Sequence, residues 1–104
     1  MSRRSAAPIF AALGDDTRLQ LVDRLRRGPL SITELAEGTD VTRQGITKHL
    51  HVLARAGLVR DTRQGRERLW ELELAPLDVA RRYLDHVSQQ WDDAIERLKR
   101  HVEE

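Results

Sequence analysis

The chain of 104 residues contains no cysteine. This absence excludes a disulfide framework, a thiolate metal site and a cysteine nucleophile. Aromatic residues are also scarce, at 4%, whereas charged residues reach 34%. Such a composition is typical of a helix-rich protein rather than an all-β one. The length favours a single domain, residues 1–104, with a modest core.

Long hydrophobic runs are absent as well. The most apolar stretch near the start, residues 6–13, is much shorter than the roughly 20 residues of a membrane-spanning helix. Arg3 and Arg4 precede it, as basic residues do in a secretory signal. However, the run passes directly into charged residues without a cleavage-like site, so we expect no signal peptide. We therefore expect a cytoplasmic protein with no membrane partner.

Enzyme motifs are missing too. The chain has no Gly-rich phosphate loop and no nucleophile-elbow motif. His49 and His51 are two residues apart on an expected helix, so their rings diverge by about 200° and cannot share a metal ion. The adjacent acids Asp92 and Asp93 fit a solvated helix face. The sequence predicts no catalytic residues, no cofactor and no enzyme.

Charge is present but unevenly placed. The net charge is +1, yet residues 42–68 hold seven basic and two acidic residues, against 11 and 15 in the remainder. A basic segment on a nearly neutral chain indicates contact with a polyanion. A solvated basic surface is the alternative that charge alone leaves open.

The N-terminal part, residues 1–30, predicts two helices. Residues 8–13 have apolar side chains at helical spacing, and Gly14 ends that helix. Asp15 or Asp16 caps the next, and Gly28-Pro29 closes it. Its apolar stripe is predicted to comprise Leu19, Val22 and Leu25, with Leu21 flanking.

Residues 31–57 predict two helices joined by a turn. Ser31 or Thr33 caps the first, and Thr42 caps the second, which runs from about Arg43 to Ala56, about 20 Å. Its inward residues are Ile46, Leu50, Leu53 and, flanking, Val52. Its outward residues are polar and basic: Arg43, Gln44, Thr47, Lys48, His51 and Arg55. A helix with such an outward face is typical of a reader of the DNA major groove.

Residues 58–74 predict a β-hairpin. Strands at 58–63 and 67–72 flank Gly65, which supplies the positive φ of a tight turn. Trp70 and Leu72 are expected to alternate with Leu69 and Glu71, as in a half-buried strand. Three arginines near the tip, Arg63, Arg66 and Arg68, fit a wing that touches DNA backbone; an edge hairpin with solubilising arginines is the alternative.

Residues 76–103 predict a long helix for dimerisation. Apolar residues recur every three or four positions over about 26 residues, close to a coiled-coil seam. A helix that long cannot bury its whole stripe on so small a domain, so we expect it to pack against a second copy with the first helix alongside. The expected interface residues are Ile9, Phe10, Leu13, Leu77, Leu84, Val87, Trp91 and Leu98.

Four short motifs then give a family resemblance over residues 9–74. They are Thr17-Arg18-Leu19, Thr33-Glu34-Leu35-Ala36, Thr47-Lys48-His49-Leu50 and Ala56-Gly57-Leu58-Val59. In this order and spacing the chain resembles the ArsR-type (ArsR/SmtB-like) winged helix-turn-helix repressors. The resemblance implies a mainly α fold with about five helices and a two-stranded wing. It also implies a homodimeric bacterial repressor of its own or a neighbouring operon.

The chain departs from the metal-sensing members of that family. Many carry a Cys-x-Cys pair on the third helix, where this chain has Leu35-Ala36-Glu37. Others bind zinc through Asp and His on the C-terminal helix. Here Asp85, His86, His101 and Glu104 have a different spacing, and only an antiparallel second subunit could bring them together. The chain is more similar to the metal-independent branch, so we expect no metal site.

The expected partner is double-stranded DNA with a pseudo-palindromic operator. Gln44 fits adenine, Arg43 or Lys48 fits guanine, and Thr47 and His51 fit base edges or phosphates. Thr42 is expected to hold a phosphate at the helix N-terminus, and His49 to have a packing role. Alternatives are a protein-interaction module, a metal sensor with a non-standard His/Asp/Glu site, and a constitutive autorepressor without an inducer.

Overall fold

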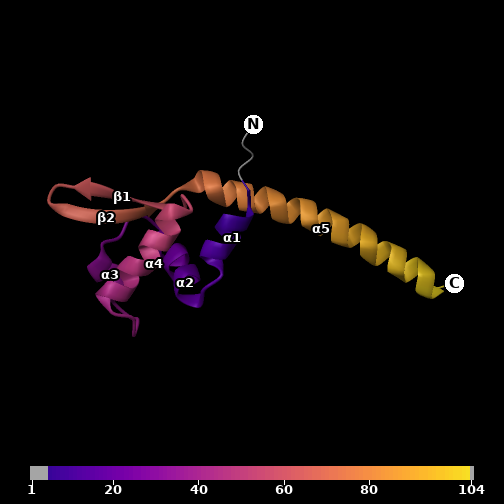
Figure 1. The fold of residues 1–104 in the computed structure, drawn as a ribbon, viewed down its shortest axis with the longest axis horizontal. Coiled ribbons are helices and arrows are strands. Elements are labelled where there is room, and N and C mark those ends of the chain that lie inside the picture. Colours follow the sequence, from indigo (N-terminus) through magenta and orange to yellow (C-terminus); the bar gives the residue numbers. More distant parts are fainter. Residues whose placement is uncertain (1–4, 104) are drawn as a thin grey trace.

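The computed structural model describes residues 5–103. Within these residues, four helices are followed by a two-stranded hairpin and a fifth helix (Figure 1). The elements are α1 (Ala7–Leu13), α2 (Asp16–Leu25), α3 (Ile32–Ala36), α4 (Arg43–Arg55), β1 (Val59–Gln64), β2 (Glu67–Leu72) and α5 (Leu74–Glu103). The order and the kinds of element agree with the sequence prediction of a winged helix-turn-helix.

Side-chain caps define where three of the helices begin. Asp15 accepts the backbone N–H of Arg18 at 3.1 Å at the start of α2. Ser31, and not Thr33, caps α3, in a reciprocal capping box with Glu34. Thr42 caps α4 by accepting from the backbone N–H of Gly45. Each cap satisfies a backbone donor that has no partner inside the helix, and so fixes the first turn.

The core is formed by the inward faces of the helices. Ile46, Leu50 and Leu53 of α4 are fully buried, as predicted, together with Leu35 of α3 and Leu58 at the start of the hairpin. Because the three residues of α4 recur at three- and four-residue spacing, α4 presents a single apolar face to the rest of the domain. The opposite face of α4 is thereby directed away from the core.

The predicted stripe of α2 is wrong at one position. Leu21 and Leu25 are buried, whereas Leu19 is 50% exposed and Val22 is only partly buried. Leu21 and Leu25 are four residues apart and share one face, while Leu19 lies about 160° around the helix from Leu21. The body therefore covers the face of Leu21 and Leu25, and leaves Leu19 outside.

The hairpin pairs β1 with β2 in antiparallel register, from Val59 opposite Leu72 to Gln64 opposite Glu67. Gly65 has φ of 62° in the two-residue turn, as predicted. The residues of β2 alternate between the two faces, but the predicted half-buried pattern is wrong, because Leu69 and Trp70 are both buried. Neighbouring strand residues point to opposite faces, so both faces are covered there. Trp70 joins the main core cluster, and Leu69 is buried outside it.

A short bridge ties the hairpin to the helical part. Leu30 and Trp70 exchange two backbone hydrogen bonds, at 3.0 and 2.8 Å. Leu30 immediately precedes the capping residue of α3. The base of the hairpin is therefore bonded to the segment that starts the helix-turn-helix.

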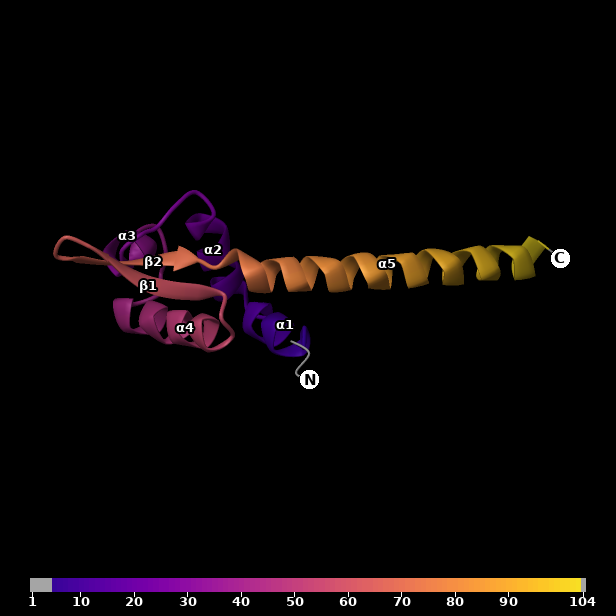
Figure 2. The same ribbon diagram turned by 90° about the horizontal axis from the view of Figure 1, so that it is seen from above.

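Helix α5 projects far beyond the rest of the chain (Figures 1 and 2). It has 30 residues, and its two buried residues, Pro76 and Ala80, lie near its start. Phe10 of α1 packs on Tyr83 with ring centroids 5.7 Å apart. The elongated extents, 67 × 37 × 21 Å, arise from this helix. Within residues 5–103, no helix has the length and apolarity required to cross a membrane.

Candidate nucleic-acid interface

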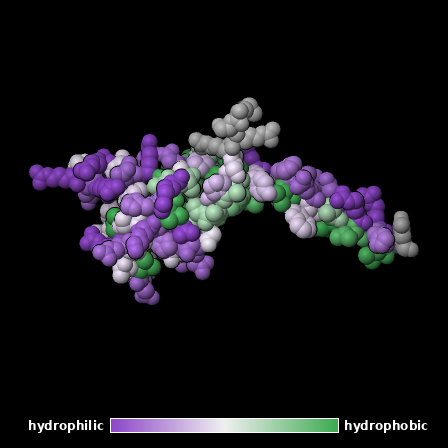
Figure 3. All heavy atoms as spheres, viewed as in Figure 1, coloured by the Kyte–Doolittle hydropathy of each residue, from purple (hydrophilic) through white to green (hydrophobic). Residues whose placement is uncertain are grey.

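The outward face of α4 is polar and carries no acidic residue. Among the predicted DNA-binding residues, Thr47 is half-buried and the remaining α4 positions are exposed. The exposed positions are Thr42, Arg43, Gln44, Lys48, His51 and Arg55. The space-filling view shows hydrophilic residues over much of the body beside this helix (Figure 3). An exposed cationic and amide-bearing helix face is suited to base edges and phosphates.

The N-terminal turn of α4 is arranged around two hydrogen bonds to neighbouring residues. The guanidinium of Arg43 donates from Nη2 to Oγ1 of Thr33 on α3. The hydroxyl of Thr47 donates to the backbone oxygen of Arg43 at 2.9 Å. The first turn has no acidic side chain. The helix dipole and the free N–H groups there therefore attract an anion without competition from a carboxylate of that turn.

The predicted wing arginines fall into two groups. Arg63 and Arg66 are exposed at the tip, and no acid among residues 5–103 pairs with either. Arg68 instead bonds Asp61 at 2.9 Å, and its guanidinium lies 5.1 Å from the ring centroid of Trp70. Arg68 is paired with Arg63 near the turn, but its side chain is partly neutralised and lies against Asp61 and Trp70 instead of standing free.

Arg60, also on β1, is neutralised more completely. Its Nε lies 2.7 Å from carboxylate oxygens of both Glu71 and Glu73. The hydrogen bond that Arg60 donates to the carboxylate of Glu71 raises the pKa of Arg60, and the nearby charge of Glu73 adds to the effect. The basic count of residues 42–68 therefore overstates the charge that is available to a polyanion.

Sequence reasoning missed Arg18 as a residue that holds the recognition helix. Arg18 donates to the backbone oxygen of Ala12 at 2.5 Å, and its Nη1 lies 3.3 Å from Nδ1 of His49. His49 is half-buried, in agreement with its predicted packing role, and lies 3.8 Å from Asp15. The backbone N–H of Arg18 lowers the pKa of Asp15, because it stabilises the charged carboxylate. The Thr17-Arg18-Leu19 motif was the sequence signal at this position.

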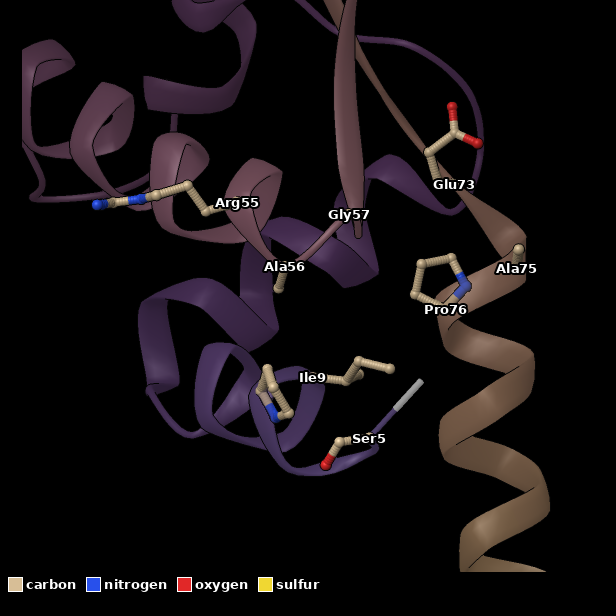
Figure 4. Close-up of a pocket in the computed structure, with 9 residues that line it drawn as sticks. Ser5, Ile9, Arg55, Ala56, Gly57, Glu73, Ala75 and Pro76 are labelled. Atoms are coloured by element: carbon tan, nitrogen blue, oxygen red, sulfur yellow. The ribbon is translucent and has the colours of Figure 1, made fainter. Parts of the chain in front are cut away.

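A cleft lies behind the recognition face, where α1, the end of α4 and the start of α5 meet (Figure 4). Its walls are mostly apolar, with Ile9 and Pro76 on opposite sides. The side chain of Arg55 extends away from this cleft (Figure 4). Arg55 is therefore directed to the exterior, on the side of the predicted DNA face.

Comparisons with known proteins agree with this geometry. A family described as "Helix-turn-helix domain" matches residues 13–62. The HTH-type transcriptional regulator Rv2034 of Mycobacterium tuberculosis is 40% identical over 82 residues, which cover 79% of this chain and 77% of that protein. An ArsR-like transcriptional regulator from Rhodococcus sp. RHA1 superimposes with a TM-score of 0.76 at 36% identity, over 91% of this chain and 90% of that one.

The chain belongs to the ArsR family of winged helix-turn-helix regulators. ArsR proteins are DNA-binding transcriptional regulators, so the predicted family, fold class and regulatory class are confirmed, and the family is not one of enzymes. A Mycobacterium bovis relative, Mb0332, is described as a homodimeric winged helix-turn-helix DNA-binding domain and a possible ArsR-family regulator. It shares 29% identity at a TM-score of 0.62, over 86% of this chain and 81% of that fragment.

The predicted dimer residues of this ArsR chain lie in different surroundings. Ile9 is already buried in the core of one protomer, so it offers little surface to a second copy. Phe10, Leu13, Leu77 and Val87 are partly buried. The exposed ones are Leu84, Trp91 and Leu98. Sequence reasoning missed other exposed apolar residues of α5, among them Leu74, Tyr83 and Ile95.

Possible metal ligands are scattered in this ArsR chain. Across residues 5–103, no three His, Asp or Glu side chains come together in a group that could hold a metal ion. Asp85 and His86 are near the middle of α5, and His101 is close to its end. Glu104 lies outside the described residues. One protomer therefore places Asp85 and His86 far from His101 along the helix.

Proposed function

We propose that the protein is a homodimeric, sequence-specific repressor that reads a pseudo-palindromic operator with α4. The observation that carries this proposal is the two-sided character of α4. Its inward face is fully buried, while its outward face combines Gln44, Lys48 and Arg55 with no acidic residue anywhere in the helix. Such a helix is fixed by the core and is free to bind DNA with its other side.

The contacts divide into base reading and backbone positioning. The amide of Gln44 can donate to and accept from adenine, and Lys48 can donate to guanine acceptors. Thr47 and His51 lie along the same face and add contacts to bases or phosphates. Thr42, Arg63 and Arg66 would bind phosphates, which fix the register of the protein but carry no sequence information. Arg68 would support the wing from its place on Trp70.

A second subunit would complete the reader. The stripe of α5 stays exposed in one protomer, at 64% for both Trp91 and Leu98 and 82% for Val102. Figure 3 shows hydrophobic residues along the outer half of this helix. The homodimeric relative from M. bovis supports a two-fold arrangement. Two α4 helices would then enter successive major grooves, with half-sites about 10 base pairs apart or a multiple of that.

The proposed setting is a bacterial cytoplasm, with the chain repressing its own or an adjacent operon. We propose that DNA binding does not need a metal ion. The chain has no cysteine, and His86 and His101 are fifteen residues apart on one helix. A separation of that size corresponds to about 22 Å along the helix axis, too far for one chain to chelate through both.

The test compares a residue that is proposed to read bases with one that is proposed to contact the DNA backbone. A duplex is first selected from a random library with the wild-type protein, and a scrambled duplex of the same composition is the control. Gln44→Ala should relax base preference and cost about 1–3 kcal/mol on the selected duplex alone, whereas Arg66→Ala should weaken both duplexes alike and reduce the salt dependence by about one unit. Fluorescence anisotropy over a range of salt concentrations measures both effects.

Two results would contradict this proposal. Identical, sequence-blind losses from both substitutions would show that α4 does not read bases directly. Failure of the wild-type chain to bind any duplex at low salt, where non-specific attraction is strongest, would count against DNA binding altogether.

A further inference from the structure

We propose that Thr33 is a positioning residue that directs Arg43 to a DNA phosphate, so that the two residues form a backbone clamp between α3 and α4. This inference rests on the proposed binding of α4 in the major groove, and it changes the role expected for Arg43 from base reading to phosphate binding. Thr33 belongs to α3 and was not among the predicted DNA-binding residues.

Helix α3, which carries Thr33, is held at both ends by hydrogen bonds. Ser31 and Glu34 bond each other's backbone N–H at the start of α3. At the other end, Arg24 of α2 donates to the backbone oxygens of Glu34, Leu35 and Glu37, at 2.7, 2.6 and 3.2 Å. Leu35 is fully buried between these two ends. The hydroxyl of Thr33 therefore sits at a position fixed by both termini of its helix.

The bond to Thr33 determines where the guanidinium of Arg43 lies. Arg43 is the first residue of α4, and its Nη2 donates to Thr33 Oγ1. The guanidinium is thereby held across the gap between α3 and α4. Gln44 and Lys48, by contrast, have no hydrogen bond to another side chain among residues 5–103 and can extend along the outer face. Arg43 is thus set apart from the two residues best placed to read bases.

The charge of Arg43 remains available to an anion. No acidic side chain among the described residues pairs with it, unlike Arg60 and Arg68 on the hairpin. A guanidinium has five N–H donors, and Thr33 uses one of them. The remaining donors can bind phosphate oxygens, a geometry for which arginine is well suited.

The position between α3 and α4 is where a phosphate is expected. In a helix-turn-helix the first helix crosses the DNA backbone while the second enters the groove. The N-terminus of α4, capped by Thr42, adds free backbone N–H groups and the positive end of the helix dipole. A guanidinium fixed at this place would meet the backbone at the mouth of the groove.

The experiment removes the hydroxyl of Thr33 without changing the shape of the side chain. Four variants are titrated against the selected and the scrambled duplex: Thr33→Val, Thr33→Ser, Arg43→Ala and the double variant Thr33→Val/Arg43→Ala. Thr17→Val is the matched control, because Thr17 is also the second residue of a capped helix, α2. Thermal unfolding of each variant is measured in parallel.

Thr33→Val should weaken binding to both duplexes by the same factor, about three- to tenfold, as expected for loss of one hydrogen bond. Arg43→Ala should weaken both as well and reduce the slope of log K against log salt by about 0.9. In the Arg43→Ala background, Thr33→Val should have no further effect, because the pair acts as one unit. Thr33→Ser should retain wild-type affinity, and Thr17→Val should not change it. Melting temperatures should stay at the wild-type value, since Thr33 and Arg43 are both exposed.

Independent, additive losses from the two substitutions would overturn the clamp, and so would a loss limited to the selected duplex, which would make Arg43 a base reader. A fall in melting temperature that accounts for the lost affinity would also overturn it, in favour of a purely structural role. In each of these cases the wild-type chain still binds DNA. Failure of the wild-type chain to bind either duplex would overturn the proposed function itself, together with the clamp.

Discussion

Helices α4 and α5 both carry an apolar stripe at helical spacing, but the stripes have opposite surroundings. Leu50 of α4 is completely buried, whereas Leu98 of α5 is 64% exposed. The same side chain at the same spacing is thus a core residue in one helix and a surface residue in the other. The difference arises because α4 has neighbours on its inward side, while the outer half of α5 extends beyond the body of the molecule (Figure 1).

The charged residues of the two helices differ in the opposite sense. In α5, Asp78 bonds Arg81 at 2.8 Å and Arg82 at 2.9 Å, so cations are paired within the helix. In α4 there is no acid, and no acid among residues 5–103 pairs with Lys48 or Arg55. Helix α4 therefore leaves its charge unsatisfied and α5 leaves its apolar surface uncovered. Each deficiency indicates the kind of partner: a polyanion for α4, and an apolar protein surface for α5.

The largest expected contrast is in stability. Leu50→Ala should lower the free energy of unfolding by about 2–5 kcal/mol, because it opens a cavity in the core. Leu98→Ala should leave the unfolding of the dilute, monomeric chain unchanged and should instead weaken self-association, by about tenfold, or about 1.4 kcal/mol. Urea unfolding and analytical ultracentrifugation measure the two quantities. Equal destabilisation of the monomer by both substitutions would show that α5 folds back on the body.

A smaller contrast is expected in DNA binding. Lys48→Ala should relax base preference and weaken binding to the selected duplex by about 1–3 kcal/mol, because Lys48 reads guanine in the proposed complex. Arg82→Ala removes the same charge from α5 and should change neither affinity nor salt dependence, because Arg82 lies outside the proposed DNA-binding residues and already pairs with Asp78. Anisotropy titrations at several salt concentrations measure both. An equal loss of DNA affinity from Arg82→Ala would mean that binding depends on the total charge of the protein and not on the position of Lys48.

The smallest effect concerns acid pH. The hydrogen bond from Arg81 lowers the pKa of Asp78 below its ordinary 3.8. Because this pKa is lower in the folded state, its contribution to stability is present above about 3.8 and is lost as the pH falls through the folded value. Asp78→Asn should therefore be slightly less stable than wild type at neutral pH, with the difference vanishing in strong acid. Thermal unfolding followed by circular dichroism tests this, and a difference that persists in strong acid would contradict it.

Much of the fold was predictable because local rules act in the same direction. The face of Ile46, Leu50 and Leu53, the cap at Thr42 and the turn at Gly65 all follow from spacing and residue type. The faces of α2 and β2 did not follow in the same way. The apolar residues of α2 span an arc of about 160° with Leu19 and Leu21 at its two edges. Periodicity therefore cannot tell which edge is buried, and only the neighbouring elements decide it.

In the candidate site, too, some features follow from the local sequence and others depend on tertiary contacts. The outward residues of α4 could be listed from the sequence, but the state of each cation could not. Pairing of Arg68 with Asp61, and of Arg43 with Thr33, depends on side chains that the fold brings together across a hairpin or between two helices. Charge counts along the sequence register all arginines equally, and only contacts separate those that are free from those already engaged.

The bridge between Leu30 and Trp70 has a mechanical consequence. Its two hydrogen bonds join the base of the hairpin to the residue before the α3 cap, so the lower part of the wing and the start of the helix-turn-helix move as one body. These bonds oppose a rigid-body rotation of the whole hairpin relative to the helices. Any adjustment to the curvature of a bound duplex must come from bending of the hairpin beyond Trp70, towards the turn at Gly65. That outer part of the hairpin can then bend while its lower part stays fixed to the helix-turn-helix.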